Sequence, residues 1–237
     1  MEATEIRRTV ELEDHHWWYR ERRAILAREL RRLRRYGPPG RALDIGAAGG
    51  GNTRVLVRHG WDALVADHSE LAVELARERG LRALHADARE LPLPDDSFDL
   101  VCAFDVLEHI EEDGRAAAEI VRVLRPGGTA LITVPCDMAL WSAHDVASGH
   151  VRRYTRPTLR ALLAGQGLVL DRMWSWNVLL RPVVARHRKS SSGSDVMELP
   201  YLVNLGLMAV ITAERYLPVR SLPGVSLIVR AHRPAHG

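Results

Sequence analysis

The stretch Leu43-Asp44-Ile45-Gly46-Ala47-Ala48-Gly49-Gly50 decides the fold class of this chain. Residues 41–45 predict a short strand and residues 52–59 predict a helix, so the glycines lie in a strand-to-helix turn. Glycines at such a turn let the backbone bend tightly and approach a ligand closely. Asp44 stands two residues before the first glycine, where a carboxylate would repel a pyrophosphate but not a cationic ligand. The turn alone indicates only a nucleotide-like ligand.

The chain around this turn alternates between strand and helix patterns. Further strands are expected at residues 62–67, 82–86, 98–104, 129–134, 168–174 and 225–231. Helices are expected at residues 13–36, 70–80, 114–124 and 156–165, with Ser69 and Thr155 as N-caps. This order predicts a doubly wound α/β fold with a largely parallel sheet, in a single domain that spans residues 1–237.

The composition is that of an ordinary globular domain. Neither Cys102 nor Cys136 suggests a disulfide framework, so a reducing, cytoplasmic setting is expected. No signal peptide is evident, and the longest apolar stretch, residues 199–213, is short for a membrane span. The arginine cluster at residues 31–35 predicts a solvated helix face rather than a nucleic-acid site.

Two further acids follow the next two predicted strands. Asp67 lies 21 positions after Gly46 (67 − 46), where a carboxylate can accept two hydrogen bonds from ribose hydroxyls. Asp87 follows the third strand and could accept a proton from an exocyclic amine such as that of adenine. Either acid alone would be assigned to an exposed turn or a helix cap. Three acids at successive strand ends indicate a ligand site at the carboxyl edge of the sheet.

Several segments then follow in the order of one known family. They are Leu43 to Gly50, Leu64-Val65-Ala66-Asp67, Ala86-Asp87-Ala88-Arg89-Glu90-Leu91-Pro92-Leu93, Phe98-Asp99-Leu100-Val101, Asp105-Val106-Leu107-Glu108-His109 and Arg122-Val123-Leu124-Arg125-Pro126-Gly127-Gly128. On these motifs the chain resembles the class I S-adenosylmethionine-dependent methyltransferases of the small-molecule kind often called type 11. The resemblance implies a Rossmann-like seven-stranded sheet whose last strand, 225–231, runs antiparallel at the sheet edge.

The resemblance also implies how S-adenosylmethionine is bound and S-adenosylhomocysteine released. Asp67 would hold the ribose, Asp87 and Ala88 would lie near the adenine, and Gly46 with Ala47 would contact the methionine part. The remaining cofactor-binding candidates are Asp44, His68, Phe104, Asp105 and His109, of which His109 would either line the cleft or cap the next helix. Ala48 departs from the family, which usually has glycine at this position.

The N-terminal segment His15-His16-Trp17-Trp18-Tyr19-Arg20-Glu21-Arg22-Arg23 is similar to one seen in some of these enzymes. There the helix covers the cofactor as a lid. Tyr19 and Arg23 would then reach the cofactor carboxylate, since Arg suits bidentate pairing. The alternative, in which Trp17 and Trp18 pack the helix onto the sheet, is compatible with this role.

The methyl acceptor is expected at the polar insertion of residues 135–153. His144 and His150 are the candidate general bases because histidine titrates near neutral pH. Asp145, Arg152, Arg153 and Tyr154 are the candidate acceptor-binding residues. The alternative is a hydrogen-bonded loop that only shapes the wall of the site. No metal ligand is assigned.

A second insertion, residues 177–223, contains the serine run 190–194, which predicts a flexible loop, and the apolar run 199–213, which predicts a helix. Burial of that helix is the default expectation; a dimer contact and a lid over an apolar acceptor are the alternatives.

The leading hypothesis is methyl transfer to a small molecule, such as a secondary metabolite or a glycoconjugate precursor. The segment Phe104-Asp105-Val106-Leu107 argues against a nucleobase amine as acceptor. A nicotinamide-dependent oxidoreductase would need the glycine turn but not Asp44. A non-catalytic cofactor-binding partner or an RNA-binding module would fit the pI of about 9.2 and the missing glycine at position 48. We expect a monomer or homodimer that binds no nucleic acid.

Overall fold

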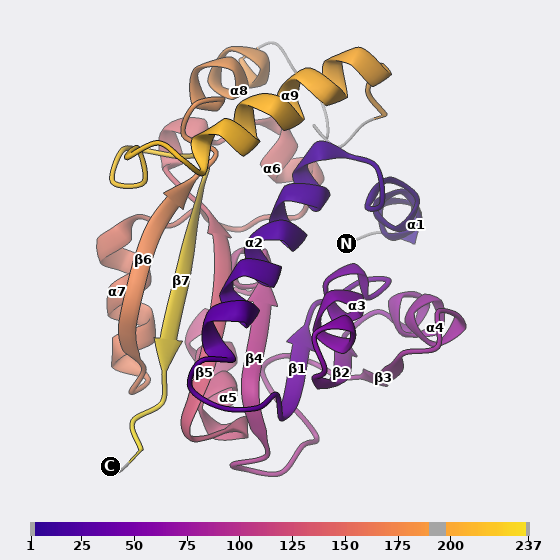
Figure 1. Ribbon diagram of the computed structural model, residues 1–237, viewed down its shortest axis with the longest axis vertical. Helices are drawn as coiled ribbons and strands as arrows, with labels where there is room; N and C mark the ends of the chain where they lie inside the picture. The colour runs from indigo at the N-terminus through magenta and orange to yellow at the C-terminus, as the bar shows by residue number, and fades with distance from the viewer. Residues whose placement is uncertain (1–2, 190–197, 236–237) are drawn as a thin grey trace.

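The computed structural model describes residues 3–189 and 198–235, and its strands form one seven-stranded sheet in the order β3-β2-β1-β4-β5-β7-β6 (Figure 1). The strands are β1 (Arg41–Ile45), β2 (Asp62–Asp67), β3 (Arg82–His85), β4 (Phe98–Phe104), β5 (Leu124–Pro135), β6 (Val169–Trp176) and β7 (Ser226–His232). β1 to β5 pair in parallel, whereas β7 pairs antiparallel with both β5 and β6. The predicted mixed sheet is confirmed. The antiparallel strand is not at the edge, however, because β7 inserts between β5 and β6.

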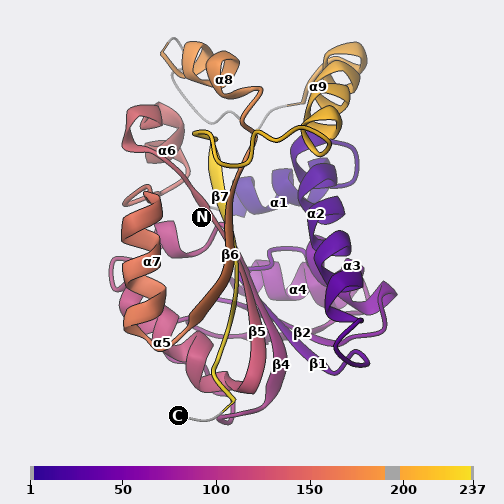
Figure 2. The same cartoon turned by 60° about the vertical axis from the view of Figure 1, so that its left-hand side comes forward.

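Helices cover both faces of the sheet. They are α1 (Ala3–Leu12), α2 (Trp17–Leu33), α3 (Gly51–Arg58), α4 (Glu70–Glu78), α5 (Asp113–Val123), α6 (Ala143–Ala147), α7 (Arg156–Gly165), α8 (Arg181–Arg188) and α9 (Tyr201–Glu214), with short 3-10 turns η1 (Leu107–His109) and η2 (Met138–Leu140). α2 and α3 lie on one face, and α5 and α7 on the other (Figure 2). Side chains of β1 alternate accordingly: Leu43 and Ile45 join the core under α5 and α7, and Ala42 joins the core under α2.

The expected helix at residues 13–36 is wrong at its start. The chain forms two helices, α1 and α2, separated by a turn at residues 13–16. His16 is the N-cap of α2, and its ring accepts a hydrogen bond from the backbone N–H of Trp18 (3.3 Å). Glu13 is buried in the turn and pairs with Arg54 and Arg79, which ties the end of α1 to α3 and α4.

The apolar run 199–213 forms the predicted helix α9, but the expectation that it is buried is wrong. Tyr201, Leu202 and Leu205 are 76%, 77% and 51% exposed. The inner side of α9 is held against α2, because Asn204 accepts from the Trp17 N–H (2.9 Å) and Arg215 pairs with the buried Glu21. The helix is therefore fixed at the end of the sheet while it presents apolar side chains to solvent. The serine run 190–194 lies outside the described residues.

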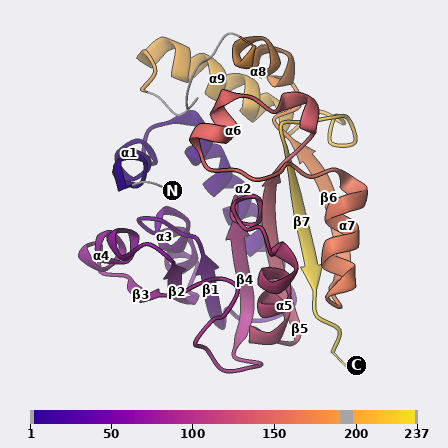
Figure 3. The ribbon, with the colours of Figure 1, turned by 180° about the vertical axis from the view of Figure 1, so that it is seen from behind.

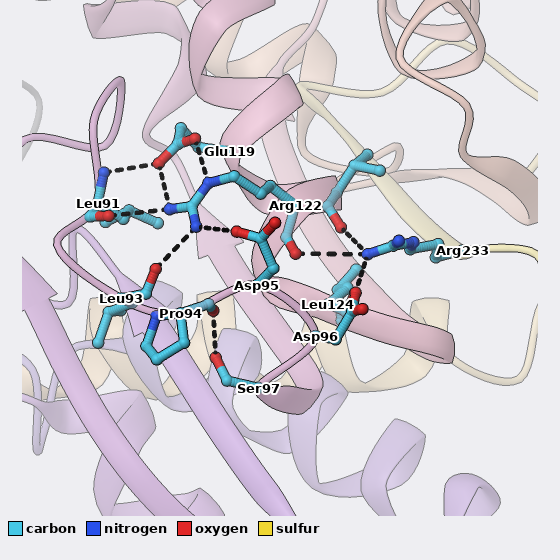
Figure 4. Close-up of polar contacts among 11 residues, drawn as sticks. Leu91, Leu93, Pro94, Asp95, Asp96, Ser97, Glu119, Arg122, Leu124 and Arg233 are labelled. Carbon is cyan, nitrogen blue, oxygen red and sulfur yellow. Dashed lines mark hydrogen bonds and ion pairs between the residues drawn. The ribbon is translucent and has the colours of Figure 1, made fainter.

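The long connection from β3 to β4 is anchored by arginines at the opposite end of the sheet (Figure 4). Arg122 of α5 donates to the backbone carbonyls of Leu91 (2.9 Å) and Leu93 (2.7 Å) and pairs with Glu119 and Asp95. Arg233 donates to the carbonyl of Leu124 (2.6 Å) in the same region. This network fixes the start of β4 and leaves the carboxyl edge of the sheet for the site. Within the described part of the chain, no helix combines the length and apolar character needed to cross a membrane.

Candidate functional site

A cavity of about 470 Å³ lies at the carboxyl edge of the sheet, where α6, α8 and α9 gather beyond the end of β4 (Figure 3). Half of the residues predicted for the site line it: Tyr19, Gly46, Ala47, Phe104, Asp105, His109, His144, His150 and Arg153. The others are not among the described residues that line this cavity: Arg23, Asp44, Asp67, His68, Asp87, Ala88, Asp145, Arg152 and Tyr154. The fold thus joins the glycine turn and the insertion 135–153 in one space.

The glycine turn is held open by left-handed backbone and by Asp67. Gly46 has φ 64°, and a Cβ built on it would lie 2.5 Å from a methyl carbon of Val106. Ala48, at the position of the usual glycine, also adopts a left-handed conformation, with φ 46°. The Asp67 carboxylate accepts from the N–H of Ala48 (2.9 Å) and of Ser69 (2.9 Å). Alanine therefore keeps the turn geometry at the expense of some backbone strain.

Asp44 is buried beneath this turn. It is 1% exposed, and its carboxylate accepts a hydrogen bond from the Thr53 hydroxyl (2.6 Å). Burial raises the pKa of Asp44 to about 7, although the Thr53 hydrogen bond works in the opposite direction. The carboxylate is thus kept out of contact with solvent.

Asp87 lies at the end of β3, outside the cavity, and is half-exposed beside Arg89. The Arg89 guanidinium donates to both oxygens of the Asp87 carboxylate (2.7–3.1 Å). This hydrogen bonding lowers the pKa of Asp87 to about 2. His68 is exposed, and its ring nitrogen lies 3.6 Å from the Asp67 carboxylate. Asp67 and Asp87 therefore lie at the ends of the neighbouring strands β2 and β3, where the sequence predicted them.

The helix α2 presents Arg22 rather than Arg23 to the cavity. Arg22 donates to the Asp105 carboxylate (2.7 Å), which also accepts from the Thr133 hydroxyl (2.9 Å). Arg23 instead reaches the backbone carbonyl of Glu13, at the end of α1. Tyr19 and Arg22 are three residues apart and share a helix face, but Arg23, four residues from Tyr19, is equally compatible with this pattern, so Arg22 was not predicted.

The two tryptophans of α2, Trp17 and Trp18, line the cavity and also pack against the sheet. Trp17 is buried among Trp174, Trp176 and Ile228, and the Trp18 ring lies 4.3 Å from that of Trp176. Their packing role and the position of α2 over the site are compatible.

Asp145 organises the opposite wall of the cavity. Its carboxylate is completely buried and accepts from Arg153 Nε (2.8 Å), Arg153 Nη2 (3.1 Å) and His150 Nδ1 (2.8 Å). Burial alone would raise the pKa of Asp145, but the hydrogen bond from His150 and the charge of Arg153 outweigh it and hold the pKa well below its usual range. Asp145 therefore positions two side chains that do line the cavity.

Arg152 and Tyr154 point elsewhere. Arg152 pairs with Asp113 (2.8 Å), and the Tyr154 hydroxyl donates to the Asp113 carboxylate (2.8 Å). Tyr154 is 3% exposed. Both side chains connect the insertion to α5, and neither is placed where the sequence predicted an acceptor contact.

Two further residues that line the cavity were not predicted from the sequence. Glu108 and Asn177 are both fully buried, and neither side chain has a hydrogen-bond partner for either of its polar atoms. Burial raises the pKa of Glu108 well above its usual range. Burial also lowers the pKa of the neighbouring His109 to about 4. Glu108 stood within a family motif, and Asn177 only marked the start of an insertion, so neither was assigned a role.

Comparisons with known proteins agree with the observed fold. Residues 43–132 match the family model described as "Methyltransferase domain". The chain is 28% identical over 193 residues to a "Probable S-adenosylmethionine-dependent methyltransferase" of Mycobacterium tuberculosis, a match that covers 79% of this chain and 69% of that protein.

A second relative and a solved structure extend these comparisons. The "Phthiotriol/phenolphthiotriol dimycocerosates methyltransferase 1" of Mycobacterium ulcerans is 32% identical over 130 residues, which cover 51% of this chain and 48% of that protein. A SAM dependent methyltransferase from Archaeoglobus fulgidus superposes with a TM-score of 0.60 at 18% identity, covering 89% of this chain and 94% of that one.

Proposed function

We propose that the chain is a class I S-adenosylmethionine-dependent methyltransferase and that it methylates a small amphipathic molecule bound between the α6 loop and helices α8 and α9. The observation that carries this proposal is the cavity, whose floor is the glycine turn and whose far side is apolar. Precursors of secondary metabolites or of glycoconjugates belong to this class of acceptor.

The donor side of the cavity suits a nucleoside with an amino-acid tail. Gly46 has a left-handed backbone and packs against Val106 with no room for a side chain, and its bare backbone lines the cavity where a ligand can approach it closely. Asp67, beside the turn, supplies the carboxylate for ribose hydroxyls. When bound, S-adenosylmethionine supplies an activated methyl group on a sulfonium sulfur. Tyr19 and Arg22 of α2 close over this part of the cavity and restrict water.

The acceptor side is mostly apolar with a few polar anchors. Leu180, Val183 and Val184 line it from the α8 region, and Val203 and Leu207 line it from α9. Ligand sites of this type use apolar walls for affinity and few polar groups for orientation. The polar groups on this side include the buried amide of Asn177, the guanidinium of Arg153, and His187 and Arg188 of α8.

The reaction requires alignment more than covalent chemistry from the protein. The acceptor atom forms a bond to the methyl carbon as the carbon–sulfur bond breaks and its electron pair stays on sulfur. The proton of an acceptor hydroxyl or amine passes to a ring nitrogen of the pair His144 and His150, whose ring centroids lie 5.9 Å apart. The M. ulcerans relative is named for small-molecule acceptors, which supports the same class here.

The test compares hydroxylated acceptors that share a head group and differ only in an aliphatic tail, with an isotopically labelled methyl donor. Each buried methylene contributes about 0.8 kcal/mol, so a tail of a few methylenes should raise kcat/KM about tenfold or more. Val203→Asn should reduce this preference, because Val203 lines the cavity.

Leu202→Asn on the same helix is the matched control, since Leu202 is 77% exposed. Equal kcat/KM for tailed and tailless acceptors, or equal effects of the two variants, would refute the apolar acceptor site.

A further inference from the structure

Three potential metal ligands meet on the wall of the cavity. Glu108 and His109 come from η1, and His150 comes from the loop after α6. One potential ligand atom from each lies within 4.8 Å of the others, and all three residues line the cavity. The two segments are joined by a hydrogen bond from the Val151 N–H to the Glu108 carbonyl (2.8 Å). The cluster is therefore a fixed feature of the fold.

Glu108 is the residue that needs a partner. Its side chain is completely buried, and neither carboxylate oxygen has a hydrogen bond. The described residues include no ion pair to it within the usual distance. A buried carboxylate without partners is strongly unfavourable, and such groups in proteins are commonly paired or bound to a metal. A cation in the cavity would satisfy it.

Hydrogen bonds fix which ring nitrogen of each histidine could bind a metal. Nδ1 of His150 donates to the Asp145 carboxylate (2.8 Å), and Nδ1 of His109 donates to the Gly149 carbonyl (3.3 Å). Because these acceptors can only accept, each ring carries its proton on Nδ1 and its lone pair on Nε2. Histidines that bind metals typically have this outer hydrogen bond.

We propose that Glu108, His109 and His150 bind one divalent transition-metal ion with the preferences of Zn²⁺. Two imidazoles and a carboxylate form a known ligand set for zinc, whereas Mg²⁺ and Ca²⁺ prefer oxygen ligands. Tetrahedral ligands with bonds of about 2.0–2.1 Å lie about 3.3 Å apart. The three atoms here must therefore draw closer by at most about 1.5 Å.

The role of the ion rests on the proposed function. Because all three residues line the cavity, an ion held by them would also be within reach of an oxygen of the methyl acceptor, which it would make more acidic. In this arrangement His150 is a ligand, and His144 is left as the proton acceptor of the pair. The expectation that the chain holds no metal ligand is replaced by this proposal.

The test is titration of the chelator-treated full chain with Co²⁺, followed by visible absorption and by elemental analysis after dialysis. We expect the wild-type protein to bind one Co²⁺ per chain. Glu108→Gln and His150→Gln should each raise the Kd for Co²⁺ by about tenfold or more. His232→Gln is the matched control, since this histidine pairs with Asp171 at the opposite end of the sheet. Thermal melting of each variant shows whether it is folded.

The proposed site is refuted if wild-type protein takes up no more Co²⁺ than Glu108→Gln. It is also refuted if His232→Gln weakens Co²⁺ binding as much as Glu108→Gln does. Titration of the same samples with S-adenosylhomocysteine separates the two proposals. Binding of this nucleoside without Co²⁺ binding overturns the metal site alone. Co²⁺ binding without nucleoside binding supports the metal site and contradicts the proposed function.

Discussion

The replacement Asp145→Asn should destabilise the protein strongly. Asp145 and Arg153 form an ion pair in which both side chains are 0% exposed. Removal of the negative charge leaves the Arg153 guanidinium buried without a counter-charge, and breaking one side of such a pair costs about 3–5 kcal/mol. In a domain of this size each kcal/mol lowers Tm by about 2–4 °C, so Tm should fall by about 6–20 °C.

The assay is urea denaturation and thermal melting of the variant beside wild type. Asp62→Asn is the matched control, because the Asp62–Arg82 pair is more than half exposed and should contribute under about 1 kcal/mol. Adding Arg153→Met to Asp145→Asn removes the stranded charge, so the double variant should recover much of the lost stability. If Asp145→Asn lowers the free energy of unfolding no more than Asp62→Asn does, the buried Asp145–Arg153 pair does not stabilise this wall of the cavity as we infer.

Three further predictions concern the cofactor side. Asp67→Asn should weaken S-adenosylhomocysteine binding by about 10- to 150-fold in calorimetry, since a hydrogen bond to a charged group is worth about 1.5–3 kcal/mol; an unchanged affinity, like that expected for the exposed control Glu70→Gln, contradicts the ribose role. Ala48→Gly should stabilise the protein by about 1 kcal/mol because it relieves left-handed backbone, and a lower Tm would argue against strain at this turn. The raised pKa of Asp44, about 7, lies above its unfolded value, so ionisation of Asp44 removes stability as pH rises from 5 to 8. The stability of Asp44→Asn relative to wild type should therefore increase by about 2 kcal/mol over that range in denaturant titrations of ligand-free protein, and a constant difference would place Asp44 near its ordinary pKa.

Local patterns predicted most of the secondary structure. The strands β1, β2 and β4 have their expected bounds, because apolar runs between turn residues specify them directly. Pro126-Gly127-Gly128 lie between the helix predicted at residues 114–124 and the strand predicted at residues 129–134. α5 does end at Val123, but β5 already starts at Leu124, which pairs with Phe98, and Pro126-Gly127-Gly128 lie in the irregularity between this pair and the next one, Leu100 with Thr129.

The edge position assigned to the last strand failed for a different reason. The pattern at residues 225–231 predicts a strand but contains no information on which neighbours it pairs with. Its insertion between β5 and β6 depends on contacts across the whole sheet.

Side-chain direction limited the prediction of the site. Arg22 and Arg23 are both compatible with a helix that covers the cavity, and only the rotation of α2 decides between them. Arg152 and Arg153 present the same problem in a loop. Arg152 pairs with Asp113, whereas Arg153 is buried and pairs with Asp145. The glycine turn and its acids were predictable because their positions follow from strand ends alone.

The position of β7 has a consequence for how the domain is made. Among the strands of the described residues, β6 pairs only with β7, and β7 separates it from β5, although β7 comes last in the sequence order of these strands. During synthesis, β5 and β6 therefore both wait with an unpaired edge until residues 226–232 have emerged from the ribosome. Long-range strand pairing of this kind is slow and exposes apolar edges to aggregation. The part of the cavity wall that α8 and α9 build at the β6–β7 end should thus form only once β7 has paired with β5 and β6.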